Sequence, residues 1–237
     1  MKEHKIKSLS QLLTLVRASF DYDDVLYRGD RKIKELKPRI AECIPNNDMP
    51  RIQMERAMFD DFMRQAIPLS EFKPDTKWDW LSLAQHHGMA TRLLDWSLNP
   101  LAAVWFAVNR PSTSNAVVWV LIPTAEDYLD PIVDSEPFEI KRTKIFRPKH
   151  ISRRIAAQMG WFTAHWYNSK NNRYAALDKI KGYEKQLQRI LIEPTHFENI
   201  RSELDICGVN ASTMFPDVDG LAKHIEWRYT LLKDEKA

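Results

Sequence analysis

Residues 83–106 concentrate polar and ionisable side chains around a single glycine and then run directly into an apolar stretch. The side chains with chemical potential in this segment are Gln85, His86, His87, Thr91, Arg92 and Asp95. A segment that only fills a core rarely holds so many such groups, because burying each without a partner costs free energy. We therefore interpret the segment as a candidate ligand-binding or catalytic site.

A second candidate is Arg28, which stands at the end of a short predicted strand over residues 24–28 and is followed by Gly29. The planar guanidinium suits phosphate or carboxylate, and a glycine allows a ligand to approach the backbone closely. The alternative is an arginine that is simply paired with Asp24 or Asp30.

Alternation along an extended chain assigns the polar residues of 91–96 to two faces. Thr91 and Asp95 share one face with Leu93, whereas Arg92 points the other way. A buried Arg–Asp pair that holds the strand against the next helix is the alternative to a ligand site.

The third candidate lies near residue 160, where Arg153, Arg154 and Gln158 precede a glycine and two aromatic residues. Gln158 is suited to hydrogen-bond an amide of a ligand, with a role at a strand edge as the alternative.

Several classes of chemistry lack their usual motifs. The sequence has no GxxxxGK[ST], GxGxxG or GxSxG, which disfavours P-loop nucleotide binding, dinucleotide-binding folds and α/β-hydrolases. No set of three or four residues has metal-ligand spacing, and we expect no metal site.

The elements that must position these residues alternate between helix and strand. Helices are expected over residues 1–19 (amphipathic, with Ser8 as N-cap), 50–65 (with an apolar stripe typical of core packing), 78–87 (capped by Asp75 and ended by Gly88), 100–108 (with Asn99 as cap and Pro100 in the first turn), 195–208 (with a capping box from Thr195) and from Asp217 onward. Strands are expected over residues 24–28, 91–96, 116–122, 160–165 and 187–193. The pattern predicts one α+β domain over residues 1–237, with a central mixed or antiparallel sheet flanked by helices and a frayed end at 233–237.

Composition narrows the setting of the protein. The 237 residues are 44% hydrophobic and carry a formal net charge of +3. This charge is compatible with an anionic ligand but is too small to indicate one. Two cysteines favour a reducing compartment, and no apolar run approaches the length of a membrane span. We expect a cytoplasmic protein without a membrane partner.

The blocks LYRG, LAQHHGMATRLLDWSLNPLAAVWFA, RRIAAQMGWF and GVNASTMFPDVDGLAKHI resemble successive blocks of FRG-domain proteins. That family is named for a Phe-Arg-Gly signature, which here reads Tyr27-Arg28-Gly29, and the resemblance covers residues 20–226 as a family core. FRG domains occur mostly in bacterial and phage-related proteins. Their block order is similar to that of ADP-ribosyltransferases, with a basic residue on an early strand, a polar segment before a helix, and a late Gln or Glu.

This resemblance implies an ADP-ribosyltransferase-like fold and an NAD-dependent transferase, acting as a toxin or anti-phage effector on RNA, DNA or protein. An antitoxin or chaperone partner is also implied. NAD would be the co-substrate. Its binding residues would be Arg28, Gly29, Gln85, His86, Thr91 and Arg92. Asp95, Gln158 and His87 would be catalytic, but an amide cannot take up a proton at neutral pH, so Asp95 or His87 would supply the base.

Two other functions stay open on the residues alone. One is a non-catalytic module that binds a nucleotide or a partner, in which the polar cluster stabilises the fold. The other is a nuclease, although no carboxylate cluster for a metal is visible.

Overall fold

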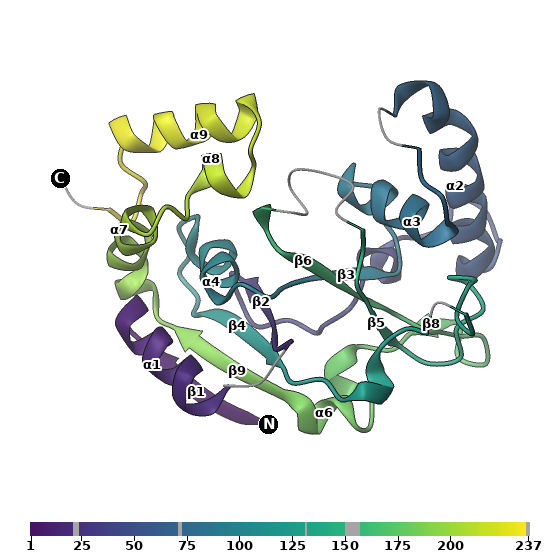
Figure 1. The fold of residues 1–237 in the computed structure, drawn as a ribbon, viewed down its shortest axis with the longest axis horizontal. Coiled ribbons are helices and arrows are strands. Elements are labelled where there is room, and N and C mark those ends of the chain that lie inside the picture. Colours follow the sequence, from purple (N-terminus) through teal and green to yellow (C-terminus); the bar gives the residue numbers. More distant parts are fainter. Residues whose placement is uncertain (21–23, 71–72, 131, 150–156, 236–237) are drawn as a thin grey trace.

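The computed structural model describes residues 1–20, 24–70, 73–130, 132–149 and 157–235, and its centre is a mixed sheet of seven strands (Figure 1). In spatial order these strands are β1 (Lys2–Ile6), β9 (Leu187–Ile192), β4 (Ala116–Leu121), β2 (Leu26–Asp30), β3 (Leu93–Ser97), β6 (Gly160–Ala164) and β5 (Lys144–Phe146). β1 and β9 are parallel, and every other neighbouring pair is antiparallel. The expected α+β class with a mixed sheet is therefore confirmed.

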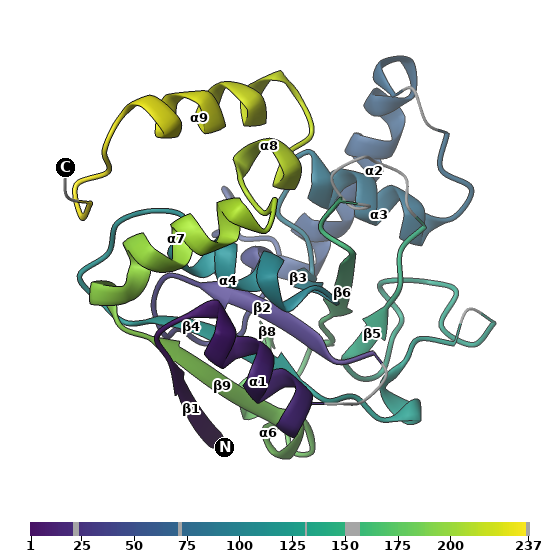
Figure 2. The same cartoon turned by 60° about the vertical axis from the view of Figure 1, so that its left-hand side comes forward.

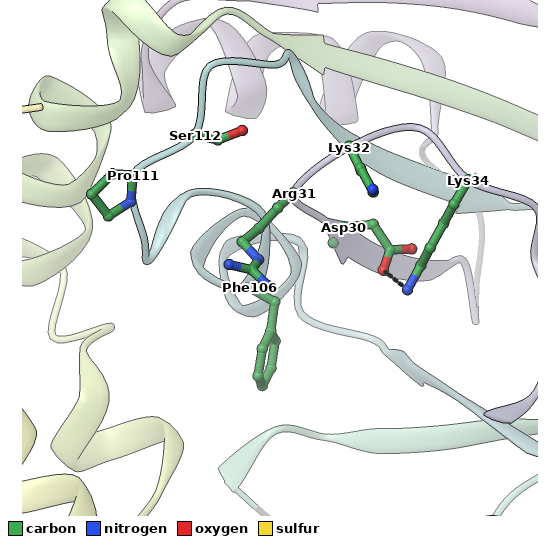
Figure 3. A pocket seen from close by; sticks show the side chains of 8 residues that line it. Asp30, Arg31, Lys32, Lys34, Phe106, Pro111 and Ser112 are labelled. Atoms are coloured by element: carbon green, nitrogen blue, oxygen red, sulfur yellow. Dashed lines mark ion pairs between the residues drawn. The ribbon is translucent and has the colours of Figure 1, made fainter.

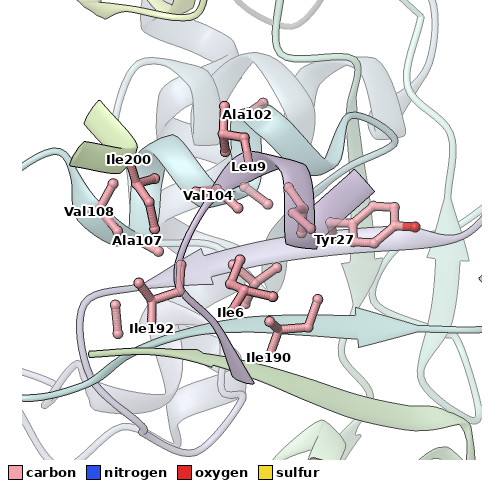
Figure 4. Packing of buried hydrophobic residues seen from close by; sticks show 14 of the residues in the cluster. Ile6, Leu9, Tyr27, Ala102, Val104, Ala107, Val108, Ile190, Ile192 and Ile200 are labelled. Carbon is pink, nitrogen blue, oxygen red and sulfur yellow. The ribbon is translucent and has the colours of Figure 1, made fainter. Parts of the chain in front are cut away.

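Three helices cover one face of the β1–β9–β4–β2 half of the sheet (Figures 2 and 4). They are α1 (Leu9–Ser19), α4 (Pro100–Val108) and α7 (Phe197–Ile206). Asn99 caps α4 by accepting a hydrogen bond from the backbone of Leu101, and Pro100 supplies its first turn, as the sequence predicted. The alanines of α4 let this helix lie close to β2.

The other half of the sheet is covered by α2 (Arg51–Ala66) and α3 (Lys77–His86), which pack on β3, β6 and β5. The remaining elements include α6 (Tyr183–Gln186), α8 (Ala211–Met214), α9 (Val218–Tyr229) and a separate hairpin of β7 (Tyr167–Asn168) with β8 (Arg173–Tyr174). Among the described residues, no helix combines the length and the apolar character that crossing a membrane requires.

The N-terminal segment differs from the helix expected over residues 1–19. Only Leu9–Ser19 is helical, because Lys2–Ile6 pairs in parallel with β9 as an edge strand. Ser8 is the N-cap as predicted, accepting from the backbone of Gln11, whose own side chain accepts from Lys7.

Other helix ends also shifted from the prediction. Thr76 rather than Asp75 caps α3, in a reciprocal capping box with Asp79. α7 begins after a 3₁₀ turn over Pro194–His196, and no side chain caps it. Asp217 caps α9 as expected.

The C-terminal tail is not frayed at residues 233–235. Asp234 and Glu235 form ion pairs of 2.8 Å each with the buried guanidinium of Arg201 on α7. Trp227 of α9 also donates to Glu235, so the tail ties α9 to the body of the protein.

Candidate functional site

The sheet is nearly divided between β2 and β3. These strands share one register pair, Tyr27 with Ser97, whereas β2 and β4 are paired along five residues. Arg28 spans the gap by donating from Nη1 to the backbone carbonyl of Asp95 at 2.8 Å. Diverging strands leave backbone groups without ladder partners, and Arg28 satisfies one of them.

Arg28 is also paired with a carboxylate on its own strand. Nε and Nη2 donate to the two oxygens of Asp30 at 3.1 and 3.3 Å, and the side chain is 15% exposed. Lys34 contacts the same carboxylate at 3.0 Å. The pairing with Asp30 that local sequence offered as an alternative is therefore present, while the guanidinium edge nearest Asp95 lies at the gap.

Asp95 is the accessible carboxylate of the predicted site. Its side chain is 61% exposed and lies 3.8 Å from Nη1 of Arg28. Gln85 of α3 donates to it at 3.1 Å, and the other end of the same amide accepts from Thr91 at 2.8 Å. Thr91 thereby fixes the orientation of Gln85. The structure thus brings four predicted residues, Arg28, Gln85, Thr91 and Asp95, into one continuous polar network.

Arg92 does not belong to this network. Its side chain is fully buried and pairs with Glu55 of α2 at 2.6 Å, not with Asp95. The guanidinium also donates to the carbonyl of Pro137 and lies over the ring of Phe138, 4.6 Å from its centroid. The expectation that Arg92 lines a ligand pocket is therefore corrected: the alternation of the strand turns it into the core, where its donors are already used.

His86 and His87 lie at the C-terminal end of α3, with their rings in edge contact at 4.9 Å. They line a cavity of about 420 Å³ together with Gly88 and Asp217, the N-cap of α9. Asp95 does not line this cavity. Within the described residues, no three His, Cys, Asp or Glu side chains are grouped to hold a metal ion.

Gln158 lies just before β6, the strand beside β3. Its side chain donates to the carbonyl of Met214 in α8 at 2.9 Å, and its backbone carbonyl accepts from Ser97 at 2.5 Å. The strand residue opposite Asp95 is Phe162, four residues further on and roughly 13 Å along the strand. Gln158 therefore joins the sheet to α8 and has no direct bond to Asp95. Arg153 and Arg154 fall outside the described residues.

Gly29 has a packing role. A Cβ at this position would lie 1.8 Å from the carbonyl oxygen of Ala103, so α4 can reach β2 only because residue 29 has no side chain. Tyr27, the aromatic residue of the signature, is buried in the core beside α4, and burial raises its pKa to about 12. On this face the signature residues on either side of Arg28 serve the junction of helix and strand.

Burial also sets the state of His165, just after β6. Its ring contacts Thr163 and the carbonyl of Ala175, each at 3.1 Å. Desolvation is the main cause that lowers the pKa of His165 to about 4; the positive charges of Arg28 and Arg92 act in the same direction, and the hydrogen bond with Ala175 opposes them. This histidine is neutral at pH 7 and belongs to the framework behind the polar network.

Sequence reasoning missed two groups of residues. Glu55 was hidden in a helix whose apolar stripe predicted only core packing, and no local signal marks it as the partner of Arg92. Arg31, Lys32 and Lys34 were overlooked although three cations within four residues directly after a strand were visible. These cations line a second cavity of about 450 Å³, beside Asp30 and Phe106 (Figure 3).

Comparison with known proteins identifies the family. Residues 23–116 match the model of the FRG domain, a segment that runs from just before β2 to the first residue of β4 and includes Arg28 and Asp95. No curated protein and no solved structure matches the chain significantly. Residues 23–116 are therefore assigned to the FRG-domain family. Gln158 lies outside the matched segment.

Proposed function

We propose that this protein is an NAD-dependent ADP-ribosyltransferase that modifies a macromolecule. The observation that carries the proposal is the order β2–β3–β6 in the sheet. These neighbouring strands carry or directly follow the three features of the resemblance: the early Arg28, the polar segment that ends at Asp95, and the late Gln158. Arg28 and Asp95, far apart in the sequence, thereby come into contact, and Gln158 lies just before the neighbouring strand β6.

Asp95 has the chemical properties that such a reaction needs. When the bond between nicotinamide and ribose breaks, nicotinamide leaves with the electron pair and positive charge develops on the ribose. A carboxylate held by Gln85 and adjacent to Arg28 can stabilise that charge. The acceptor nucleophile then bonds to the ribose carbon, and its proton passes to a base, for which the exposed Asp95 is our assignment and His87 the second candidate.

Arg28 and Gln85 would hold the co-substrate. The guanidinium edge at the gap between β2 and β3 is a donor for phosphate, and a phosphate would compete with Asp30 for it. We include a role as a toxin or anti-phage effector, with an antitoxin or chaperone as partner, in the same proposal, because a transferase acting on essential macromolecules would need such control.

The test is incubation of the purified protein with labelled NAD and a bacterial lysate, followed by measurement of nicotinamide release and of label bound to macromolecules. Treatment with nuclease or protease then identifies the acceptor class. Asp95→Asn should lower the transfer rate about 100-fold or more, as for loss of a positioned acid–base group. Asp60→Asn, at an exposed position of α2, is the matched control and should keep the wild-type rate.

The variant separates chemistry from folding. Because Arg92 pairs with Glu55, the change at Asp95 leaves no buried cation without a partner. An Asp95→Asn protein that transfers label as fast as the wild type would refute the assignment of this residue. Absence of release and of transfer by the wild type would refute the transferase.

A non-catalytic module that binds a nucleotide or a partner is the second candidate, favoured by the contacts within the fold that already engage Arg28 and Gln85. In that case NAD or another nucleotide would raise the melting temperature without any release of nicotinamide. Thermal shift and release measured on the same samples distinguish the two functions.

A further inference from the structure

The cavity beside the end of β2 has a positively charged wall (Figure 3). It measures about 450 Å³, within the range of roughly 300–1,000 Å³ typical of ligand sites. One side is formed by the end of β2 and the segment that follows it, and the other by α4 and the loop after it. The lining residues are Gly29, Asp30, Arg31, Lys32, Lys34, Phe106, Pro111 and Ser112.

The positive charge at this cavity exceeds the negative charge. Asp30 is its only carboxylate among the lining residues, and both Arg28 and Lys34 already contact it. Arg31 and Lys32 are exposed and have no side-chain hydrogen bond or ion pair to any other residue that the structure describes. An uncompensated pair of cations at a concave surface attracts an anion, and a phosphate ester is the anion that an Arg–Lys pair suits best.

An aromatic ring stands beside these cations. Phe106 is partly buried and lines the same cavity as Arg31 (Figure 3). Edge contacts with Trp105 at 5.1 Å and with Phe215 at 6.1 Å hold the ring. A ring held in the wall of the cavity that these cations line offers a surface on which an unpaired base can stack while its phosphate is neutralised.

We propose that this cavity binds single-stranded nucleic acid, with backbone phosphate at Arg31 and Lys32 and a base against Phe106. The inference rests on the proposed function in one respect: it makes the bound strand the acceptor. Asp30 supports this placement, because it lines the cavity and also contacts Arg28, which reaches Asp95. An acidic peptide would satisfy the cations but offers no base to stack on the ring, and a base-paired duplex keeps its bases stacked on each other.

Binding is measured by fluorescence anisotropy with labelled oligo-dT and oligo-U of twelve nucleotides over a series of salt concentrations. Each lost phosphate contact lowers the slope of log affinity against log salt by about 0.7. Arg31→Glu/Lys32→Glu should therefore lower this slope by about 1.4 and the affinity at 0.1 M salt by about 25-fold. Lys170→Glu/Arg173→Glu is the matched control, because it makes the same change of charge at exposed positions around the β7–β8 hairpin. The control should bind within about twofold of wild type, apart from any general effect of net charge.

Phe106→Leu keeps an apolar side chain and removes the ring, and it should weaken binding about fivefold or more with an unchanged salt slope. Circular dichroism and melting temperature establish that each variant is folded. Wild-type protein that binds neither oligonucleotide, or a charge reversal no more damaging than the control, would overturn the proposal.

The co-substrate provides the remaining outcome. If Arg31→Glu/Lys32→Glu abolishes the thermal shift by NAD while oligonucleotide affinity stays at the wild-type value, the cavity is the dinucleotide site and our proposal is wrong. Because anisotropy requires no catalysis, strand binding without transfer would count against the transferase alone. Transfer to protein without strand binding would count against this cavity alone.

Discussion

Replacement of Glu55 by glutamine tests whether Arg92 is a structural residue. The two side chains are 1% and 2% exposed, and the carboxylate of Glu55 accepts from Nε, Nη2 and the backbone amide of Arg92 and from the hydroxyl of Tyr174. Glutamine has nearly the same shape, but it lacks the negative charge, and its NH2 group would face the hydrogen-bond donors of Arg92 and Tyr174. An unpaired charge in such a position costs about 3–5 kcal/mol, and we expect the free energy of unfolding to fall by that amount.

A double-mutant cycle isolates the interaction of the pair. Arg92→Met removes the cation, so Glu55→Gln should cost much less in that background than in the wild type. The coupling free energy should be about 2–3 kcal/mol, at the upper end of values for residues in contact. Denaturation by urea, followed by circular dichroism at pH 7, gives all four values. Asp95→Asn serves as the exposed control and should change stability by less than about 0.5 kcal/mol.

The result that would refute this reasoning is also clear. A loss below about 1 kcal/mol for Glu55→Gln would mean that Arg92 does not depend on this carboxylate. If Arg92→Met then abolished the thermal shift by NAD while leaving stability intact, Arg92 would be a ligand-binding residue after all.

Two further predictions follow from packing and from burial. Gly29→Ala should destabilise the protein by about 3 kcal/mol or more in urea denaturation, because the new Cβ would lie 1.8 Å from the carbonyl oxygen of Ala103. Gly88→Ala, with φ of 84° and no neighbour within 4 Å, should cost about 1 kcal/mol, and equal losses would contradict the packing role of Gly29. His165 has a pKa of about 4 in the folded state against 6.5 unfolded, so the unfolded chain binds more protons between these values and stability must fall as the pH falls through that window. The loss from this group between pH 7.5 and pH 5 should be about 2 kcal/mol, and it should be absent in His165→Gln; an unchanged pH dependence in that variant would contradict it.

Local signals in the sequence were sufficient to predict elements that begin or end at Asn, Pro or Gly or that consist of one apolar run. Asn99-Pro100 located the start of α4, Gly88 in the left-handed conformation ended the turn after α3, and the apolar run at β4 marked a central strand. β1 was missed because its partner is β9, more than 180 residues away, and its own sequence KEHKI is too polar to indicate a strand. Lys2–Ile6 forms a strand because its backbone pairs with β9.

Alternation along residues 91–96 was the most useful sequence signal at the site. It assigned Asp95 and Arg92 to opposite faces, and the structure places Asp95 at the surface and Arg92 in the core. The prediction went wrong only where it assigned both residues to one pocket. The face that packs against α2 is the one that carries Arg92, because Arg92 pairs with Glu55. These residues are 37 positions apart, so no local pattern contains this contact.

The pairing of Arg28 with Asp30 constrains any ligand at this site. A cation that must first leave a carboxylate contributes less to binding than a free one, so an anion at Arg28 gains only the difference between two partners. Asp30 is also paired with Lys34. The carboxylate of Asp30 therefore keeps a partner if the guanidinium of Arg28 moves to a ligand. Arg31 and Lys32, the next cations along the chain, form no ion pair with a described residue and can supply most of the long-range attraction. On the proposed function, Arg31 and Lys32 would attract the anion and Arg28 would then hold it.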